Sequence, residues 1–409
     1  MTLQKLVCTA CACLCDDIEI EVEDNCITKI KNACITGSSF IYASKSEKQR
    51  SQNMIEGKNV STEEALKKAA SLLKESKKPL LFGFDKSTIE AQAKAIELAE
   101  TLGATIDDNS SFCKGELVKT ILKKINNTCS FEEAKESDAI IFWGSNPYQS
   151  HPRHLSTLSY YTHKKYKEEG WYPDVTLITV EIRDTEIMDV CDQFIKILPG
   201  DDINLISSIL AILDGKEGTE DAKEIVDTIK ISKFCVIYTG LGLDYSLNSD
   251  YELFNLMIKR LGELSRIAVI PMIGHYNMLG FNKQLYEKTG FVNKVNFSNG
   301  TSHKPEFSFI EQIRNKEPDC ILIMGSDPMT SLPQSLLKNF EGIPLITIDP
   351  YISETTEISQ VVLSSAISSL ETGGNAIRMD WTNIPLSNCF PTKIPSDEEL
   401  INQLIEMVK

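Results

Sequence analysis

Residues 138–147 read DAIIFWGSNP, and residues 319–328 read DCILIMGSDP. Each stretch is an apolar run of strand length that ends in Gly-Ser, an Asn or Asp, and Pro, so each predicts a buried strand followed by a tight loop. A second matched pair follows, because residues 177–183 read LITVEIR and residues 345–350 read LITIDP. The two pairs predict two related halves, each a doubly wound αβα sheet with mainly parallel strands.

The two glycine loops are the first candidate binding sites. Doubly wound sheets bind ligands at the carboxyl ends of their strands, and a glycine there lets backbone amides approach a phosphate. A matched pair predicts two nucleotide-like ligands or one large pseudo-symmetric cofactor, although a plain strand-end turn is the alternative for either loop alone. The candidate cofactor-binding residues are Gly144, Ser145 and Asn146 in one loop and Gly325, Ser326 and Asp327 in the other.

A group of N-terminal cysteines predicts a metal centre. Cys8, Cys11 and Cys15 have the spacing C-x2-C-x3-C, and Cys34 follows after 18 intervening residues. This pattern fits four thiolates around one [4Fe–4S] cluster, with Cys13 as a spare thiol because the one-residue gap is too tight. A zinc site is the first alternative, although zinc sites of four cysteines usually show two C-x2-C pairs. Structural thiols without a metal are the second.

Strand-like and helix-like segments alternate from Ser61 nearly to the C-terminus, which predicts an α/β architecture. We expect three domains: a small N-terminal iron–sulfur domain at 1–55, a discontinuous αβα domain at 56–135 and 300–409 that carries Cys113, and a second αβα dinucleotide-binding domain at 136–299.

Composition narrows the class of protein. The net charge of −16 argues against a nucleic-acid partner. No apolar run approaches the ~18 residues of a membrane span, and residues 1–5 show no signal-peptide core. Thiolate ligands together with the remaining cysteines are simplest to explain in a reducing cytoplasm.

Cys113 is a candidate reactive thiol. It lies in the polar stretch 108–115, just before a predicted helix, and is followed by Lys114. A helix N-terminus and a neighbouring ammonium both favour the thiolate, which can act as a nucleophile or bind a soft metal. A partly buried loop cysteine without such a role is the alternative.

Taken together, these motifs resemble the catalytic B subunit of formylmethanofuran dehydrogenase, within the molybdopterin oxidoreductase superfamily. The resemblance covers nearly the whole chain. It rests on the cysteine run and on WGSNP at 143–147, HPRH at 151–154, PMIGHYN at 271–277, GSDP at 325–328 and AIRMD at 376–380.

The resemblance implies an enzyme of archaeal methanogenesis from CO2. Ferredoxin-like subunits would pass electrons through the [4Fe–4S] cluster to tungsten or molybdenum held by two pyranopterin guanine dinucleotides. The centre would reduce CO2 to formate, which an amidohydrolase subunit condenses with methanofuran. A separate small subunit would supply the covering β-barrel, for which this chain has no room. The residues implied are Cys113 as metal ligand, Lys114 and His275 beside the metal, and His151 and Arg153 at the cofactor.

Two positions depart from the family pattern. Lys114 stands where the family has histidine, and Ile273 stands where it has arginine. Loss of a proton donor and of a cation would weaken stabilisation of the transition state. The sequence therefore leaves two further hypotheses: a divergent paralogue that transfers electrons or fills a structural place without turnover, and a zinc-bearing interaction subunit.

Overall fold

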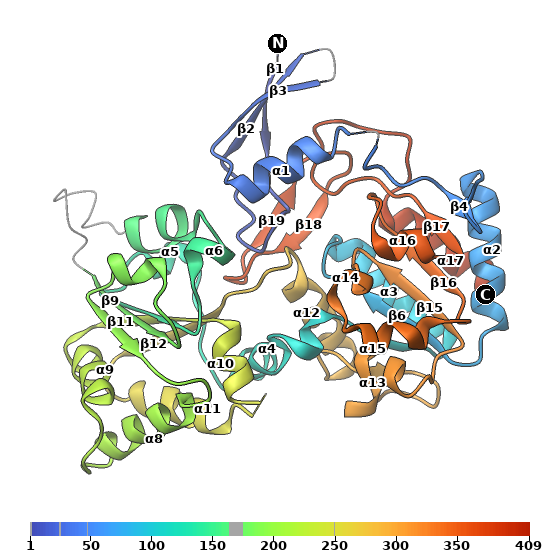
Figure 1. Cartoon of the computed structure of the whole chain (residues 1–409). Coiled ribbons are helices and arrows are strands. Elements are labelled where there is room, and N and C mark those ends of the chain that lie inside the picture. Colours follow the sequence, from blue (N-terminus) through green and yellow to red (C-terminus); the bar gives the residue numbers. More distant parts are fainter. Residues whose placement is uncertain (1, 24–25, 47, 163–174, 249) are drawn as a thin grey trace. The chain divides into compact units, whose positions relative to one another are not determined.

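The computed structural model describes residues 2–23, 26–46, 48–162, 175–248 and 250–409. The chain forms two compact units. Unit 1 comprises Met1–Phe112, His275–Arg378 and Asn383–Lys409, and unit 2 comprises Cys113–Gly274 and Met379–Thr382. Figure 1 shows most of unit 2 in green and yellow, whereas the blue and orange segments and most of the red ones belong to unit 1. Unit 2 is therefore an insertion in the sequence of unit 1.

A nine-stranded sheet forms the centre of unit 1. Its middle strands β7, β6, β15, β16 and β17 are parallel, and short antiparallel strands extend both edges. In sheet order the strands are β14 (Ser302–His303), β13 (Val295–Asn296), β7 (Thr105–Asp107), β6 (Pro79–Gly83), β15 (Cys320–Met324), β16 (Leu345–Ile348), β17 (Val361–Leu363), β4 (Met54–Ile55) and β5 (Lys58–Asn59).

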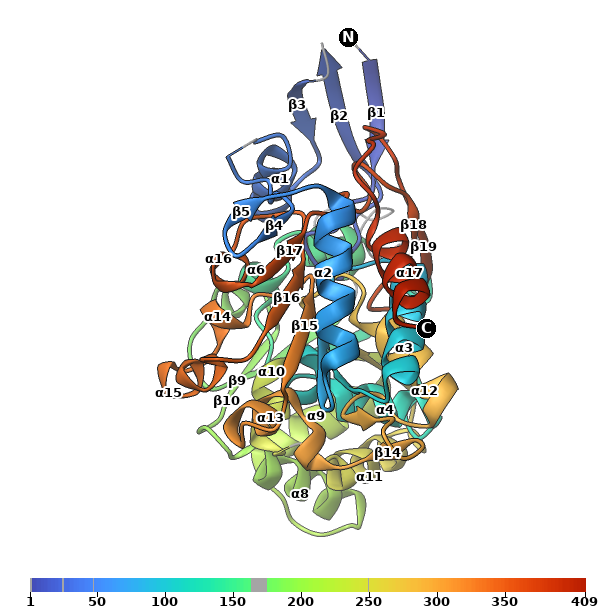
Figure 2. The same ribbon diagram turned by 90° about the vertical axis from the view of Figure 1, so that its right-hand side faces the viewer.

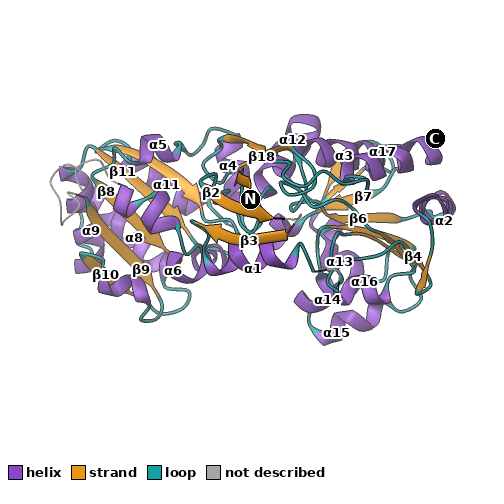
Figure 3. Ribbon diagram, turned by 90° about the horizontal axis from the view of Figure 1, so that it is seen from above, coloured by secondary structure: helices purple, strands orange, loops and turns teal. Residues whose placement is uncertain are grey.

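Helices cover both faces of this sheet because its strands are apolar on both sides. Leu81 of β6 packs with one group of helices, whereas Leu80 and Phe82 pack with α13 (Phe309–Arg314) on the other face. Figure 3 shows the two helical layers, and Figure 2 shows α2 standing beside the strands. The first layer holds α2 (Thr62–Glu75), α3 (Ile89–Leu102), α12 (Met278–Thr289) and α17 (Asp397–Val408); α14 (Pro328–Ser331), α15 (Gln334–Leu337) and α16 (Glu354–Ile358) lie with α13.

The N-terminal segment adds a small antiparallel sheet to unit 1. The order is β1-β2-β3, and α1 follows with Cys34 as its N-cap residue. A second small sheet pairs β18 with β19 near the C-terminus. The bounds are β1 (Thr2–Leu6), β2 (Ile18–Glu23), β3 (Cys26–Lys31), α1 (Ile35–Ala43), β18 (Gly374–Ile377) and β19 (Asn383–Leu386).

Unit 2 is built on a five-stranded sheet in which every pairing is parallel. Ile141 and Trp143 pack with α8, α9 and α11 on one face, whereas Phe142 stacks on Tyr238 on the other. The strands in sheet order are β10 (Gln193–Lys196), β9 (Thr176–Glu181), β8 (Ala139–Trp143), β11 (Phe234–Thr239) and β12 (Arg266–Pro271). The α-helices among the described residues are α4 (Gly115–Leu122), α5 (Phe131–Ala134), α6 (Pro147–Ser150), α8 (Asp202–Leu213), α9 (Glu220–Ile231), α10 (Leu241–Ser246) and α11 (Glu252–Leu261).

The prediction of a mixed α/β fold with mainly parallel sheets is confirmed. The predicted domain boundaries differ from the observed units. Residues 275–299 belong to unit 1, because β13 pairs with β7 of that sheet. Residues 113–135 belong to unit 2, because Leu117 and Ile121 of α4 pack in its core. A separate N-terminal iron–sulfur domain and a relationship between two halves stay predictions. Among the described residues, no helix is long and apolar enough to cross a membrane.

Candidate cofactor site

The loop after β15 lies where the strand order of unit 1 changes direction. The chain runs from β6 to β7 on one side and from β15 to β16 and β17 on the other, so the direction changes between β6 and β15. Open α/β sheets bind ligands in the crevice at such a point. Gly325 has a left-handed φ of 61°, and its N–H donates to the Ile348 carbonyl oxygen at 3.1 Å. The loop therefore turns away directly above the ends of two parallel strands.

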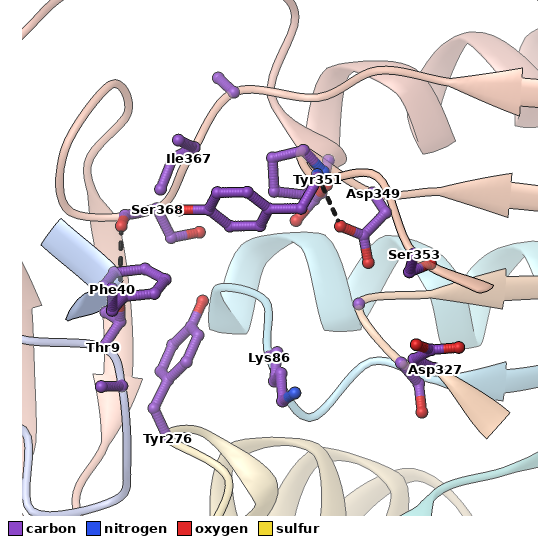
Figure 4. A pocket seen from close by; sticks show the side chains of 16 residues that line it. Thr9, Phe40, Lys86, Tyr276, Asp327, Asp349, Tyr351, Ser353, Ile367 and Ser368 are labelled. Carbon is purple, nitrogen blue, oxygen red and sulfur yellow. Dashed lines mark hydrogen bonds between the residues drawn. The ribbon is translucent and has the colours of Figure 1, made fainter. Parts of the chain in front are cut away.

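A cavity of about 270 Å³ opens at this loop within unit 1. Figure 4 shows the rings of Phe40 and Tyr276 toward one end and the carboxylates of Asp327 and Asp349 at the other, with Lys86 between them. The residues that line it are Gly325, Ser326 and Asp327 after β15; Asp349, Pro350, Tyr351 and Ser353 after β16; Lys86 after β6; and Thr9, Ala10, Phe40, Tyr276, Ala366, Ile367, Ser368 and Asp397. The cavity is slightly smaller than the roughly 300 Å³ at which the usual size range of ligand pockets begins.

Buried carboxylates set the chemistry of this cavity. Burial raises the pKa of Asp349 to about 7, although a hydrogen bond of 2.8 Å from the Tyr351 N–H opposes this. Burial likewise raises the pKa of Asp397 to about 6, and its Oδ1 has no hydrogen-bond partner among the described residues. Such groups favour a ligand that donates hydrogen bonds, which would satisfy the carboxylates and favour their charged form.

Asp327 has a structural role as well. Its Oδ1 accepts hydrogen bonds from the Thr355 N–H at 3.1 Å and from the Thr355 hydroxyl at 2.5 Å. These bonds tie the loop after β15 to the N-terminal turn of α16. Ser326 is buried, and the Asn109 Nδ2 lies 3.5 Å from its Oγ. The three loop residues predicted for cofactor binding thus all line the cavity, and one of them also anchors the loop.

The loop after β8 has the same backbone arrangement in unit 2. The strand order changes direction between β8 and β11, and Gly144 has a φ of 62°. The Gly144 N–H donates to the Val180 carbonyl oxygen at 2.9 Å, as the Gly325 N–H does to Ile348. The Gly240 N–H donates to the Trp143 carbonyl oxygen at 2.7 Å. Both predicted loops therefore lie above paired parallel strands.

Gly240 is a residue that the sequence analysis missed. A Cβ at this position would overlap the carbonyl group of Gly144, so the close approach of β8 and β11 requires glycine there. The signal was present as Gly-Leu-Gly directly after the buried strand β11. Ser145 is buried, and the Asn146 amide accepts from the Tyr148 N–H at 3.2 Å.

Lys114 is fully buried, and its ammonium donates to the Gly240 carbonyl oxygen. Burial lowers its pKa, although the thiol of Cys113 and the carboxylate of Asp244 oppose this. The ammonium of Lys114 is therefore hydrogen-bonded to the backbone just after β11. Cys113 is half-buried two residues before α4, so the predicted helix start is confirmed. Ile273 is also fully buried.

The predicted cluster ligands come together in unit 1. The Cys8 N–H donates to the Cys15 carbonyl oxygen at 2.9 Å, which closes the loop that carries three of the cysteines. A Cβ on Gly37 of α1 would lie 3.0 Å from the Cys8 sulfur and 3.7 Å from the Cys34 sulfur. Burial raises the pKa of Cys8 to about 12. The thiols of Cys15, Cys11 and Cys34 raise it further.

This set of donors fits a metal centre. Convergent thiols that raise one another's pKa are stabilised as thiolates when a cation lies among them. Cys13, predicted to be a spare thiol, is fully buried and forms a hydrogen bond with Cys11 that lowers the pKa of Cys11. Sulfur donors suit either an iron–sulfur cluster or zinc, so both alternatives from the sequence remain.

The remaining predicted residues lie in two places. His151 is buried in unit 2, where its Nδ1 pairs with Ser150 Oγ at 2.9 Å and its Nε2 with the Ile273 carbonyl oxygen at 2.7 Å. Both ring nitrogens thus have partners, and cofactor contact by His151 stays a prediction. Arg153 is half-buried nearby. His275 is in unit 1, where its Nδ1 pairs with the buried carboxylate of Asp85.

Two relatives match the chain over nearly their whole length. It is 32% identical to the B subunit of the tungsten-containing formylmethanofuran dehydrogenase 2 of Methanocaldococcus jannaschii, an alignment that covers 100% of this chain and 98% of the relative. It is 30% identical to the protein of the same name from Methanococcus maripaludis, with 99% and 98% covered. No protein-family model matches the chain.

Two solved structures share the fold. Acetylene hydratase from Pelobacter acetylenicus aligns with a TM-score of 0.73 at 12% identity, covering 99% of this chain and 69% of the hydratase. A chain of the formyltransferase/hydrolase complex of Methylorubrum extorquens, solved with methylofuran, aligns with a TM-score of 0.67 at 18% identity, covering 87% and 98%. At these identities the likeness concerns the fold.

Proposed function

Because the chain belongs to the family of formylmethanofuran dehydrogenase B subunits, we propose that it is the subunit of such a dehydrogenase that reduces CO2 to formate. The observation that carries this proposal is full-length similarity to two tungsten-containing subunits, together with a cavity at the predicted loop of unit 1. The cofactor would be tungsten or molybdenum held by two pyranopterin guanine dinucleotides, which would supply or accept two electrons.

The residues of the cavity suit the guanine end of one dinucleotide. Guanine presents N1–H and 2-amino donors along one edge, and the carboxylates of Asp349 and Asp397 are acceptors. The aromatic rings of Phe40 and Tyr351 would pack against a flat base. The loop at 144–147 would serve the second dinucleotide in unit 2, and the Cys113 thiolate would bind the metal.

The N-terminal thiols would hold the electron-transfer centre. Cys8, Cys11, Cys15 and Cys34 would bind one [4Fe–4S] cluster, which ferredoxin-like subunits would supply with electrons. An amidohydrolase subunit would take up the formate, and a small subunit would add the β-barrel. The multi-subunit formyltransferase/hydrolase complex among the structural neighbours supports such an assembly.

Metal and nucleotide analysis of the purified complex tests the proposal. We expect about four iron atoms per chain, together with tungsten or molybdenum and guanine nucleotide released by acid. Iron alone would instead identify an electron-transfer paralogue without turnover. Zinc alone would identify an interaction subunit.

The paralogue is a serious second candidate because of two positions. Lys114 and Ile273 replace the family's histidine and arginine, and both are fully buried in this structure. Ile273 carries no charge that could orient formate, and the Lys114 ammonium is already paired with the Gly240 carbonyl oxygen. Formate oxidation by the metal-loaded complex with an artificial acceptor decides between the two functions, because the paralogue would show none.

Two matched cysteine variants test the cluster assignment. Cys34→Ser should remove or destabilise the cluster, because the fourth thiolate is lost. Cys13→Ala should retain the iron, and it controls for the loss of a neighbouring buried thiol. Iron content and the visible absorption of the cluster are the measurements. Full retention of iron in Cys34→Ser would rule out Cys34 as the fourth ligand.

A further inference from the structure

A buried carboxylate faces His275 in unit 1. Asp85 follows β6 and is fully buried, and its Oδ2 pairs with His275 Nδ1 and accepts from Asn109 Nδ2 at 2.7 Å. Its Oδ1 has no hydrogen-bond partner among the described residues. The His275 side chain keeps 36% of its surface exposed, so the accessible part of this pair is the imidazole. The pair was not visible in the sequence, where 190 positions separate the two residues.

Backbone hydrogen bonds hold the two segments together independently of the pair. The Asn277 N–H donates to the Asp85 carbonyl oxygen at 3.0 Å, and Asn277 Nδ2 donates to Ser87 O at 2.7 Å. Gln92 Nε2 bridges Phe84 O and Asn277 O, each at 2.9 Å. Asn277, the asparagine of the Gly-His-Tyr-Asn motif, thus joins the two segments through hydrogen bonds, and His275 is the partly exposed polar residue of the motif.

The carboxylate fixes the proton on one nitrogen of the ring. Burial alone would raise the pKa of Asp85, but the charge and hydrogen bond of His275 and the hydrogen bond of Asn109 hold it below its ordinary value. An ionised carboxylate can only accept, so the Nδ1 of His275 carries a proton, and Nε2 is the ring nitrogen left to take up or release one. A buried carboxylate that orients an imidazole in this way also stabilises the imidazolium once it forms.

We propose that Asp85 is a positioning residue that holds His275 as the proton acceptor and donor of the formate reaction; this rests on the proposed function. In formate oxidation the C–H bond breaks, CO2 leaves and two electrons pass to the redox centre. The proton goes to Nε2 of His275, and the resulting imidazolium keeps its Nδ1–H on Asp85. In CO2 reduction the same proton returns. Lys114 does not compete for this role, because its ammonium is held by Gly240 O.

The protonation pattern of His275 is the first test, and it does not depend on turnover. The full chain, with its 5 histidines labelled with ¹⁵N, would be studied by NMR, and the His275→Gln variant would identify the signal. In the neutral ring we expect the proton on Nδ1 and none on Nε2. A proton on Nε2 instead would overturn the assignment of Asp85.

Kinetics in the assembled complex are the second test. Asp85→Asn should lower kcat for formate oxidation about 100-fold or more while KM stays within about threefold, because the charge behind the imidazolium is lost. Asp107→Asn is the matched control. Asp107 is equally buried in unit 1 and accepts from the Phe309 N–H at 2.7 Å and the Lys294 N–H at 3.0 Å. This control should keep kcat within about threefold.

The two tests separate the possible failures. An unchanged kcat in Asp85→Asn, in complexes with equal metal content, would overturn the positioning role. An equal loss of kcat in Asp107→Asn would do so too, because it would reduce the effect to burial. A metal-loaded complex without formate oxidation would overturn the proposed function, whereas the NMR signal would still decide whether Asp85 fixes the proton on His275.

Discussion

The loop at 325–328 in unit 1 and the loop at 144–147 in unit 2 have nearly the same sequence but different neighbours. Both begin with a glycine in the left-handed region, and both donate that glycine's N–H to the next parallel strand. In unit 1 the adjoining strand ends lead to Asp349 and Lys86, which line a cavity. In unit 2 the adjoining strand β11 is followed by Gly240, whose carbonyl oxygen accepts a hydrogen bond from the ammonium of Lys114. The repeated motif thus sets the backbone path, and the neighbouring loops set the chemistry.

The largest effect should come from filling the space between paired strand ends. Gly240→Ala would place a Cβ on the Gly144 carbonyl, and Gly83→Ala would place one on the Met324 carbonyl at a φ of 106°. Each substitution should lower the free energy of unfolding by about 3 kcal/mol or more, or prevent folding. Gly274→Ala is the control, because it meets no atom within 4 Å. Chemical denaturation measures all three. If Gly240→Ala left the free energy of unfolding unchanged while Gly83→Ala lowered it, the two loops would not be structurally equivalent.

The second effect concerns Asp349, which follows β16, and Glu181, the last residue of β9. Asp349 has a pKa raised from 3.8 to about 7, so it favours the folded state at low pH, and that stability is lost as the pH rises from about 4 to about 7. The loss amounts to about 1.4 kcal/mol for each unit between the two values. Asp349→Asn should flatten this slope in the chain freed of nucleotide. Glu181→Gln, at the end of β9, should flatten it less. Calorimetry between pH 4.5 and 7.5 measures the dependence of stability on pH for both variants. Equal slopes in Asp349→Asn and Glu181→Gln would show that the two acids do not differ in this respect.

Two lysines beside the strand ends provide a third contrast. Lys114→Ala leaves a cavity and an unpaired Gly240 carbonyl, and should cost about 2 kcal/mol. Lys86→Ala removes an exposed side chain and should cost less than about 0.5 kcal/mol. For ligand binding we expect the opposite order, with Lys86→Ala weakening binding more than Lys114→Ala, because Lys86 lines the cavity. Titration with a guanine nucleotide, beside thermal unfolding, tests both halves of this expectation. Weak binding after Lys114→Ala but not after Lys86→Ala would contradict it.

A fourth contrast concerns the polar residues of the loops themselves. Asp327→Ala removes two hydrogen bonds to Thr355 and should cost about 1–2 kcal/mol. Asn146→Ala removes a cap on the short helix α6 and an exposed bond of 2.7 Å to Glu186, and should cost about 0.5–1 kcal/mol. Urea midpoints compare the two. A larger cost at Asn146 would show that the loop of unit 2 is the better anchored one.

Local patterns predicted the elements well. The apolar runs at 139–143 and 320–324 are strands β8 and β15, as their glycine-terminated sequences indicated. The alternation predicted from Ser61 onward begins with α2, where Ser61 and Glu64 form the capping box. These features succeed because each depends on residues within a few positions of one another.

Long-range pairing explains what could not be predicted. Val295 and Asn296 form a strand of 2 residues that places the segment after His275 in unit 1, and so short a strand has no readable period. The pairing of Asp85 with His275 joins distant segments, so no spacing rule applies. The burial of Lys114 is likewise a property of the packed unit. Resemblance marked Lys114 and His275 as site residues, but only the structure shows what each side chain contacts.

The insertion of unit 2 into unit 1 has a consequence for synthesis on the ribosome. All five strands of the unit 2 sheet lie between Ala139 and Pro271, whereas β6 at Pro79–Gly83 pairs with β15, which begins only at Cys320. The nascent chain therefore contains the whole sheet of unit 2 while the apolar strand β6 still lacks its partner β15. We expect chains stalled near residue 310 to resist protease within the strands β8 to β12 and to be cut around 79–107. This interval exposes the chain to aggregation, and a chaperone that covers the early strands would shorten it.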